Sequence, residues 1–252
     1  MTGRIAALFR HPIKGFMPQK IDGALLEAGK AFPGDRLWAI ENGPCGFDPE
    51  RPGHISKSRF TVLAKMAKVA LARTDYDVAS GRLNATAPGM AAFAGRLTEE
   101  PDRTAFAAWL TDLLGDAAAG PLRVVDGAGH RFLDHPQGHI SIINLASVRD
   151  FEARLGKPVD PLRFRANLYV EGWPAWVENG WTGRDLILGD ARATVFAPIT
   201  RCAAPDVDPT TAERDIEVTA RLHEFYGHLL TGIYVHVTQP GRVAEGDEAT
   251  LI

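Results

Sequence analysis

The feature of this sequence that most limits its possible folds is a series of short apolar runs separated by turn residues. Most of the runs are four to seven residues long, rich in Val, Ile, Leu or aromatic residues, and bounded by Gly, Pro or Asp, which is typical of β-strands. They lie at residues 4–10, 36–41, 61–72, 122–126, 167–171, 185–188, 192–197 and 233–238. With 25 Gly and 17 Pro in 252 residues, this spacing favours small barrels or folded sheets over alternating strand–helix–strand units.

Three further segments carry apolar residues at helical spacing. They lie at residues 102–114, 145–155 and 215–226. We expect Asp102 and Asn144 to cap the first two helices, and Gly156 and Gly227 to end the second and third. The composition changes near residues 87–101, which predicts a domain boundary between a first part of nearly all strand and a second part that mixes a barrel with three helices. The expected fold class is therefore mostly β with a few helices (α+β).

Charge and cysteine content argue against several classes of protein. The net charge is −3 and the isoelectric point is about 6.2, whereas a protein that binds nucleic acid through phosphate neutralisation is usually basic. Neither a signal-peptide pattern nor a run of about 18 apolar residues is present, so no membrane segment is expected. Cys45 and Cys202 alone do not make a disulfide scaffold. The simplest expectation is a cytoplasmic protein with reduced thiols.

Cys202 is the clearest candidate for chemistry. It follows Pro198-Ile199-Thr200-Arg201, directly after the strand-like run that ends at residue 197. A thiol in a polar loop beside a guanidinium is expected to be reactive, and its sulfur suits a soft or redox-active metal. The alternative is a free structural cysteine, which is usually buried among apolar residues. Cys45, in a Gly-Pro-Cys-Gly turn, has less support for a functional role.

Several charged residues lie near turns and allow two interpretations. Lys14, Arg36 and Arg165 each lie beside a short apolar run; taken singly they are ordinary surface charges, whereas together with Cys202 they could bind an anionic cofactor. Their spacing alone does not show that they converge. The acidic cluster that follows Cys202 could bind a cation, although a turn at Asp208 and a helix start are the simpler explanation. This cluster consists of Asp206, Asp208, Glu213 and Asp215.

Common cofactor and metal motifs are absent from the sequence. It has no GxGxxG, Walker or GxSxG motif, so nucleotide-binding and serine-hydrolase folds lose their usual support. The eight histidines show no zinc-ligand pattern. His135 and His139 are four residues apart, but Pro136 and Gly138 argue against a helix that would bring them onto one face.

Four stretches, in order along the chain, resemble the MOSC proteins, the molybdenum-cofactor sulfurase C-terminal domain superfamily. Residues 8–15 (LFRHPIKG) resemble the opening YPVKS segment of that family, and residues 34–40 (GDRLWAI) resemble its GDRxW strand. Residues 164–170 (FRANLYV) resemble its FRPN strand, and Thr200-Arg201-Cys202 followed by Val207-Asp208-Pro209-Thr210-Thr211 resembles its (S/T)RCxxxxVDPxTG motif. The set covers nearly the whole chain, and is much more specific than any one motif.

The resemblance implies an N-terminal MOSC-associated β-barrel domain at residues 1–100, a MOSC β-barrel domain at 101–252, and a molybdenum cofactor held between them. Cys202 would be the metal ligand and the catalytic residue. The other implied cofactor-binding residues are Lys14, Arg36 and Arg165 for the pterin and its phosphate, and Asn167, Thr200, Arg201, Ser141 and Asn144 for the rest of the pocket. The chain departs from the family pattern at Gly15, where better-known members have Ser, at Ala166, which replaces Pro, and in residues 136–144 and 203–206.

Three functions remain open at this point. The resemblance implies a reductase that converts N-hydroxylated small molecules, such as hydroxylamines and amidoximes, to amines. No Cys follows Cys202 in this sequence, so we expect no iron–sulfur domain held by four Cys ligands, and a separate flavin or iron–sulfur protein would then supply the electrons. The second possibility is a carrier that holds sulfur or the cofactor through Cys202. The third is a MOSC scaffold that has lost the cofactor.

Overall fold

The computed structural model describes residues 1–135 and 140–252. In these ranges the fold is mostly β with three α-helices, as expected. The strands are β1 (Thr2–Arg10), β2 (Gln19–Ile21), β3 (Gly23–Leu26), β4 (Trp38–Asn42), β5 (Arg73–Tyr76), β6 (Arg82–Thr86), β7 (Phe93–Arg96), β8 (Leu122–Asp126), β9 (Ile140–Asn144), β10 (Leu168–Glu171), β11 (Asp185–Leu188), β12 (Ala191–Thr200), β13 (Leu230–Gln239), β14 (Gly241–Ala244) and β15 (Glu248–Leu251). The helices are α1 (Glu100–Leu114), α2 (Leu145–Leu155) and α3 (Val218–Tyr226).

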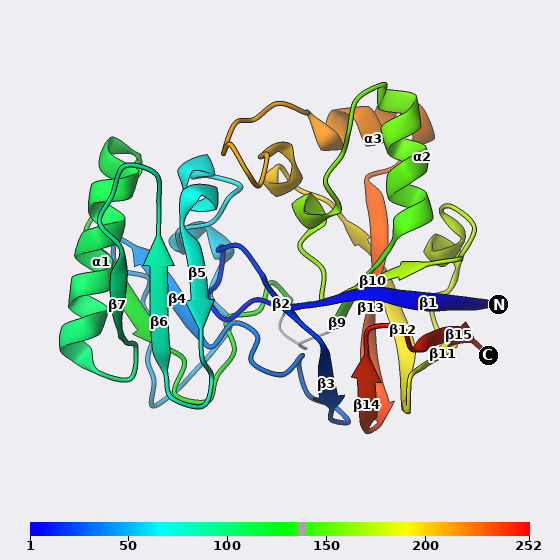
Figure 1. Cartoon of the computed structure of the whole chain (residues 1–252), viewed down its shortest axis with the longest axis horizontal. Helices are drawn as coiled ribbons and strands as arrows, with labels where there is room; N and C mark the ends of the chain where they lie inside the picture. The colour runs from blue at the N-terminus through cyan, green and yellow to red at the C-terminus, as the bar shows by residue number, and fades with distance from the viewer. Residues whose placement is uncertain (136–139) are drawn as a thin grey trace.

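Seven strands close into a barrel. Their order is β10-β9-β13-β12-β11-β15-β1, the pairing of β1 with β10 completes the circle, and β2 extends β1 on one side. All neighbours are antiparallel except β9 and β10. Because β1 pairs with both β10 and β15, the first and last strands of the chain lie side by side, and both termini lie at the same end of the molecule (Figure 1).

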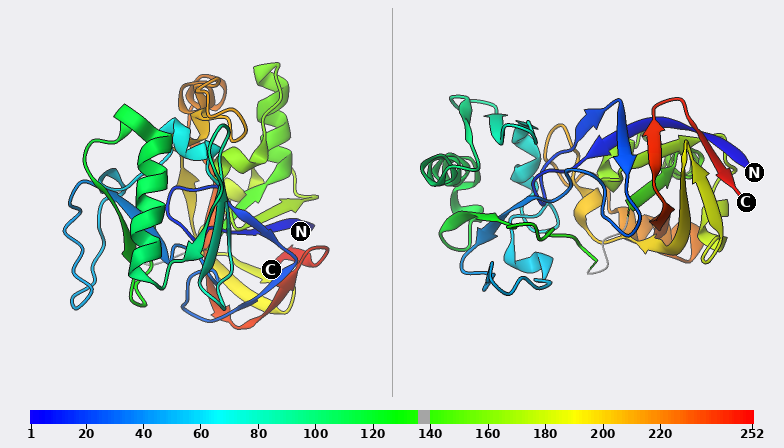
Figure 2. Two further views of the ribbon diagram at one scale, coloured as in Figure 1. Left: turned by 60° about the vertical axis from the view of Figure 1, so that its left-hand side comes forward. Right: turned by 90° about the horizontal axis from the view of Figure 1, so that it is seen from below.

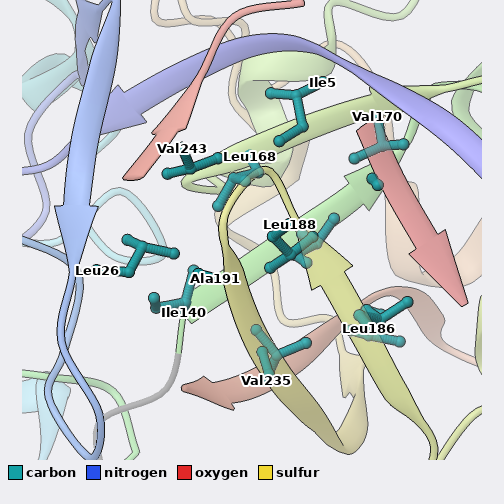
Figure 3. Packing of buried hydrophobic residues seen from close by; sticks show 14 of the residues in the cluster. Ile5, Leu26, Ile140, Leu168, Val170, Leu186, Leu188, Ala191, Val235 and Val243 are labelled. Atoms are coloured by element: carbon teal, nitrogen blue, oxygen red, sulfur yellow. The ribbon is translucent and has the colours of Figure 1, made fainter. Parts of the chain in front are cut away.

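Alternating side chains fill the barrel. Along β12, Ala191, Ala193 and Val195 are buried in the barrel core, whereas Arg192 between them is exposed, as the two-residue period of a strand requires. Figure 3 shows the side chains of Ile5, Leu168, Leu188, Val235 and their neighbours directed toward one another inside the barrel. The core therefore draws on several of the runs that predicted the strands, and also on residues outside them, such as Leu26, Ile140 and Val243.

A second unit packs beside the barrel around its own core. It contains the β4–β8 pair and the sheet β5-β6-β7, with Phe106, Leu110 and Leu114 of α1 buried against them. Figure 1 and the right-hand view of Figure 2 show α1 on the side of this unit away from the barrel. Helices α2 and α3 instead cover the barrel and share a third core with it. The boundary between residues 100 and 101 stays a prediction, and α1 and β8 pack with elements that precede it.

Local signals located several elements correctly. Strands β8 and β11 and helix α2 have the predicted bounds. The Asn144 side chain caps α2 by accepting from the Ala146 amide at 3.0 Å, and Gly156 ends it in a left-handed conformation. Gly227 ends α3 in the same way.

The strand predicted at residues 61–72 is wrong. This segment forms turns and a short 3₁₀-helix at Ala67–Leu71. Leu63, Met66 and Val69 are all buried in the second core, and their three-residue spacing is that of a 3₁₀ turn rather than a strand. A short apolar run does not distinguish these conformations by itself.

Two helix starts also differ from the prediction. Helix α1 begins at Glu100, and the Asp102 carboxylate accepts from the Arg96 amide at 2.6 Å instead of capping the helix. Helix α3 begins at Val218 rather than at residue 215, because Asp215 instead pairs with Lys157 and a buried arginine. His139 lies outside the described residues. No helix in the described ranges combines the length and the apolar character that crossing a membrane requires.

Candidate functional site

A cavity lies where the second unit meets the barrel. The residues predicted to bind a cofactor line it from both sides: Lys14, Arg36, Ser141, Arg165, Asn167, Thr200, Arg201 and Cys202. Lys14 comes from the segment between β1 and β2, and Arg36 from the segment just before β4. The others come from the barrel strands β9, β10 and β12 and the loops beside them. The fold therefore brings together residues that lie as far apart in the sequence as Lys14 and Cys202.

Asn144 is the predicted cofactor residue that does not line this cavity. Its Oδ1 caps α2, and its Nδ2 donates to the Pro174 carbonyl and to Glu178 Oε2, both at 2.8 Å. Asn144 therefore connects α2 to the turn that contains Glu178. Its amide hydrogen bonds are directed away from the cavity lining.

The buried carboxylate of Asp35 connects the two sides of the cavity. It accepts from the His11 amide at 2.6 Å and from Asn167 Nδ2 at 2.9 Å, and it pairs with the guanidinium of Arg36. Asn167 Oδ1 in turn accepts from Ser141 Oγ at 2.9 Å. Ser141 and Asn167 thus hold β9 and β10 in register and orient Arg36 through Asp35.

Two of the cavity arginines have unusual backbone conformations. Arg36 has φ 47° and Arg165 has φ 55°, both in the left-handed region that non-glycine residues rarely adopt. Such conformations cost free energy and persist where the surrounding structure imposes them, often at functional sites. In each case the strained residue is one of the cavity's cationic side chains.

Arg165 lacks a carboxylate partner within the described residues. Its Nη1 donates to the Phe16 carbonyl at 2.7 Å. Burial, together with the nearby charge of Arg36, lowers the pKa of Arg165 to about 10. The surroundings therefore disfavour this positive charge, and an anion in the cavity would relieve the unfavourable interaction.

Lys14 forms an ion pair with Asp134, and the surrounding charges keep Asp134 ionised. Its Nζ donates to Asp134 Oδ1 at 2.6 Å and to the Phe132 carbonyl at 3.0 Å. Burial lowers the pKa of Lys14, although Asp134 opposes this effect. Desolvation would raise the pKa of Asp134, but the charges of Lys14 and Arg36 outweigh it and hold that pKa below its ordinary value.

The strand β12 and its end position the cysteine. Cys202 lies two residues beyond the last residue of β12, Thr200, and is half-buried at the cavity. Between them, Arg201 donates from Nε to the Thr231 carbonyl and from Nη1 to the Phe164 carbonyl, each at 2.9 Å. Arg201 is therefore bonded to backbone on both sides, which holds the loop of Cys202 in place.

The loop after Cys202 is anchored by a buried arginine that the sequence reasoning missed. Arg163 Nη2 lies 2.8 Å from carboxylate oxygens of both Asp208 and Asp215. Asp208 Oδ1 also accepts from the Thr210 amide at 2.7 Å, so its predicted role in a turn is confirmed. Asp208 and Asp215 of the acidic cluster thus stabilise the loop after Cys202. The sequence feature that could have identified Arg163 is its position directly before the stretch 164–170.

Lys57 was also missed, because no motif surrounds it. It belongs to a short 3₁₀ turn, Lys57–Arg59, in the second unit, and its Nζ lies 3.4 Å from Cys202 Sγ. Burial would lower its pKa, but Cys202 and Asp134 outweigh this effect and raise it.

In the described part of the chain the lining includes six basic residues and one carboxylate, that of Asp134. The basic residues are Lys14, Arg36, Lys57, Arg163, Arg165 and Arg201.

Two family models match consecutive parts of the chain. Residues 2–119 match the MOSC N-terminal beta barrel domain, and residues 129–250 match the MOSC domain. The chain belongs to the MOSC domain family. The cavity therefore lies where residues of the MOSC domain, including Cys202, face those of the MOSC N-terminal domain, including Lys14, Arg36 and Lys57.

Named MOSC relatives match only parts of the chain. Mitochondrial amidoxime-reducing component 1 of Mus musculus is 28% identical over 123 residues, which is 44% of this chain and 36% of that protein. Molybdenum cofactor sulfurase of Caenorhabditis briggsae is 29% identical over 148 residues, 56% of this chain and 20% of that protein. The crystal structure of the YUAD protein from Bacillus subtilis aligns over 100% of this chain and 96% of that one, with TM-score 0.46 and 15% identity. The chain thus spans about a third or less of the two curated relatives.

Proposed function

We propose that this protein is a molybdenum-cofactor reductase that converts N-hydroxylated small molecules to amines, with electrons from a separate flavin or iron–sulfur protein. The observation that carries the proposal is the cavity between the two units, where Cys202 meets a strongly basic lining. Relatives named as an amidoxime-reducing component and a molybdenum cofactor sulfurase support the cofactor and the reaction class. Both cysteines are free, which suits the reducing cytoplasm.

The residues present fit a molybdenum–pterin group. Arg165 has a half-buried guanidinium without a carboxylate partner in the described chain and a lowered pKa, as expected for a residue whose anionic partner is a ligand. Cys202 offers the soft sulfur donor that such a metal prefers. Arg36 adds a second guanidinium, and guanidinium groups bind phosphate through paired hydrogen bonds.

The proposal gives each side chain a defined task. Arg36 and Arg165 would bind the phosphate, Lys14 would add charge beside them, and Cys202 would hold the metal. When bound, the cofactor would supply the two-electron redox chemistry. Asp35 and Arg201 do not need to touch the ligand, because their hydrogen bonds orient Arg36 and the Cys202 loop.

The first test is the molybdenum content of protein expressed in a host that makes the cofactor. We expect near-stoichiometric molybdenum in the wild type and in the control Cys45→Ala, and its loss in Cys202→Ala. Folded wild-type protein without molybdenum, or equal metal in Cys202→Ala, would contradict the proposal. Reduction of an aryl amidoxime by chemically reduced viologen, lost in Cys202→Ala, then tests the activity.

One observation favours a second function, in which the protein carries sulfur. The half-buried Cys202 lies at the cavity, where a thiol can be reached, and a relative is named a sulfurase. In that case intact mass spectrometry would show one additional sulfur atom on Cys202, removable by a thiol reductant. The protein would then transfer this sulfur without reducing N-hydroxylated compounds.

A further inference from the structure

Lys57 reaches the cavity from the second unit and meets the cysteine of the barrel. Its Nζ lies 3.4 Å from Cys202 Sγ, although the two residues are 145 positions apart. Its backbone belongs to the short turn Lys57–Arg59, whose three residues are all exposed. The ammonium group therefore lies beside the sulfur and is open to solvent, where a ligand that approaches the sulfur meets it.

Most other cations of the lining are already bonded within the protein. Lys14 pairs with Asp134, Arg36 with Asp35, and Arg163 with two aspartates, while Arg201 donates to backbone carbonyls. Lys57 has no ion pair with a carboxylate in residues 1–135 and 140–252. Asp134 acts on Lys57 only through its charge and forms no direct ion pair with it, so the ammonium group beside the Cys202 sulfur is not part of a structural ion pair.

We propose that Lys57 forms a carboxylate-binding subsite beside Cys202, so that the site prefers small molecules with a carboxylate close to the reacting group. This inference rests on the proposed function for its substrate class, which becomes N-hydroxylated compounds that carry a carboxylate. An ammonium and a carboxylate form a charge-assisted hydrogen bond, and the other basic residues of the lining increase the local concentration of anions. The apolar wall formed by Val62, Leu63 and Ala64 is suited to the uncharged part of such a molecule.

The preference for anions can be measured without the cofactor by alkylation of Cys202. Iodoacetate and iodoacetamide both attack the same sulfur, so the ratio of their rates cancels the intrinsic reactivity of the thiol and reports the effect of the reagent's charge. The full chain, expressed without cofactor in a Cys45→Ser background, is compared with Lys57→Gln. Because an exposed pair of unit charges is worth up to about 1 kcal/mol, we expect the iodoacetate-to-iodoacetamide ratio to fall about fivefold.

Lys68→Gln is the matched control, since Lys68 is an exposed lysine of the same unit that does not line the cavity. Its ratio should equal that of the wild type. A salt concentration of about 1 M should also reduce the wild-type ratio, because the Debye length then shrinks to about 3 Å. An equal ratio in the wild type and Lys57→Gln would overturn the inference.

A second measurement uses the loaded protein and a pair of amidoximes that differ only in a carboxylate. We expect the ratio of KM for the carboxylate-bearing compound to KM for the neutral compound to rise about fivefold in Lys57→Gln. If the alkylation ratio falls but neither amidoxime is reduced, the carboxylate subsite stands and the proposed function fails. If both are reduced with the same KM in wild type and Lys57→Gln, and the alkylation ratio is also unchanged, the proposed function stands and the subsite fails.

Discussion

At the scale of single residues, Gly15 has a structural reason for its departure from the family pattern. Its φ is +89°, and a Cβ at this position would lie 2.2 Å from the Thr61 carbonyl oxygen. The turn that carries Thr61 therefore approaches the Gly15 backbone too closely for any side chain. The serine of better-known members is excluded here by the path of residues 61–72, which is also the segment that sequence periodicity misassigned.

Replacement of Gly15 by the family's serine should therefore damage the protein rather than restore a hydrogen bond. We expect Gly15→Ser to lower the free energy of unfolding by about 2–3 kcal/mol, from backbone strain and displacement of Thr61. Chemical denaturation measures this loss. Gly15→Ala is the matched variant and should cost about the same, because the clash comes from the Cβ. A Gly15→Ser protein as stable as the wild type would refute this explanation.

At the scale of elements, Asn144 joins β9 to α2 and to the turn at Val177–Gly180. Its amide caps α2 and donates to the buried carboxylate of Glu178, which Ser147 Oγ also contacts at 2.8 Å. Burial raises the pKa of Glu178, although these two donors oppose the shift. The contacts of Asn144 thus serve to position α2 on the barrel, whereas the resemblance implied a contact with the cofactor.

The two roles of Asn144 predict different results for Asn144→Ala. We expect the free energy of unfolding to fall by about 2–3 kcal/mol, from loss of the cap and of one donor to a buried carboxylate, while molybdenum content stays near that of the wild type. Asn167→Ala removes an amide that lines the cavity, and it should reduce both the free energy of unfolding and the molybdenum content. Denaturation curves and metal analysis of the two variants decide between the roles. Loss of molybdenum from an Asn144→Ala protein of unchanged stability would support direct cofactor contact.

At the scale of the whole molecule, Arg214 bonds the two sides of the cavity to each other. It donates to the Leu63 and Ala64 carbonyls of the second unit, both at 2.8 Å, and to the Ala203 carbonyl next to Cys202 at 3.0 Å. Val207, in the same loop, is buried in the core of the second unit. The loop after Cys202 therefore belongs structurally to both units, and its position depends on their contact.

Removal of this link should weaken the site more than the fold. We expect Arg214→Met to lower the free energy of unfolding by about 1–2 kcal/mol, to speed hydrogen exchange in residues 61–66 and 203–206, and to speed the loss of molybdenum on dialysis. Arg221→Met is the control, because Arg221 pairs with Glu224 three residues further along the same helix. If both variants retain molybdenum equally, the contact between the units does not control cofactor retention.

The sequence by itself determined the local features of this protein. The short apolar runs of β8 and β11, the cap at Asn144 and the stop at Gly156 are signals from neighbours in the chain, and so the bounds of these elements could be predicted. Strands β5, β6 and β7 were missed, since they have few apolar residues and owe their conformation to partners. Cys202, Arg36, Arg165 and Arg201 could be recognised from the sequence because each lies in a stretch that resembles a motif of the MOSC family.

Only the tertiary structure decided which residues share the cavity. Lys57 is in no motif, and it becomes part of the site solely because the second unit packs against the barrel and brings its Nζ to Cys202. The path of residues 61–72 was decided in the same way, by burial of Leu63, Met66 and Val69 in a core that other segments complete. Local propensity depends on adjacent residues, whereas burial and charge pairing depend on contacts between distant ones, and those contacts form only in the folded chain.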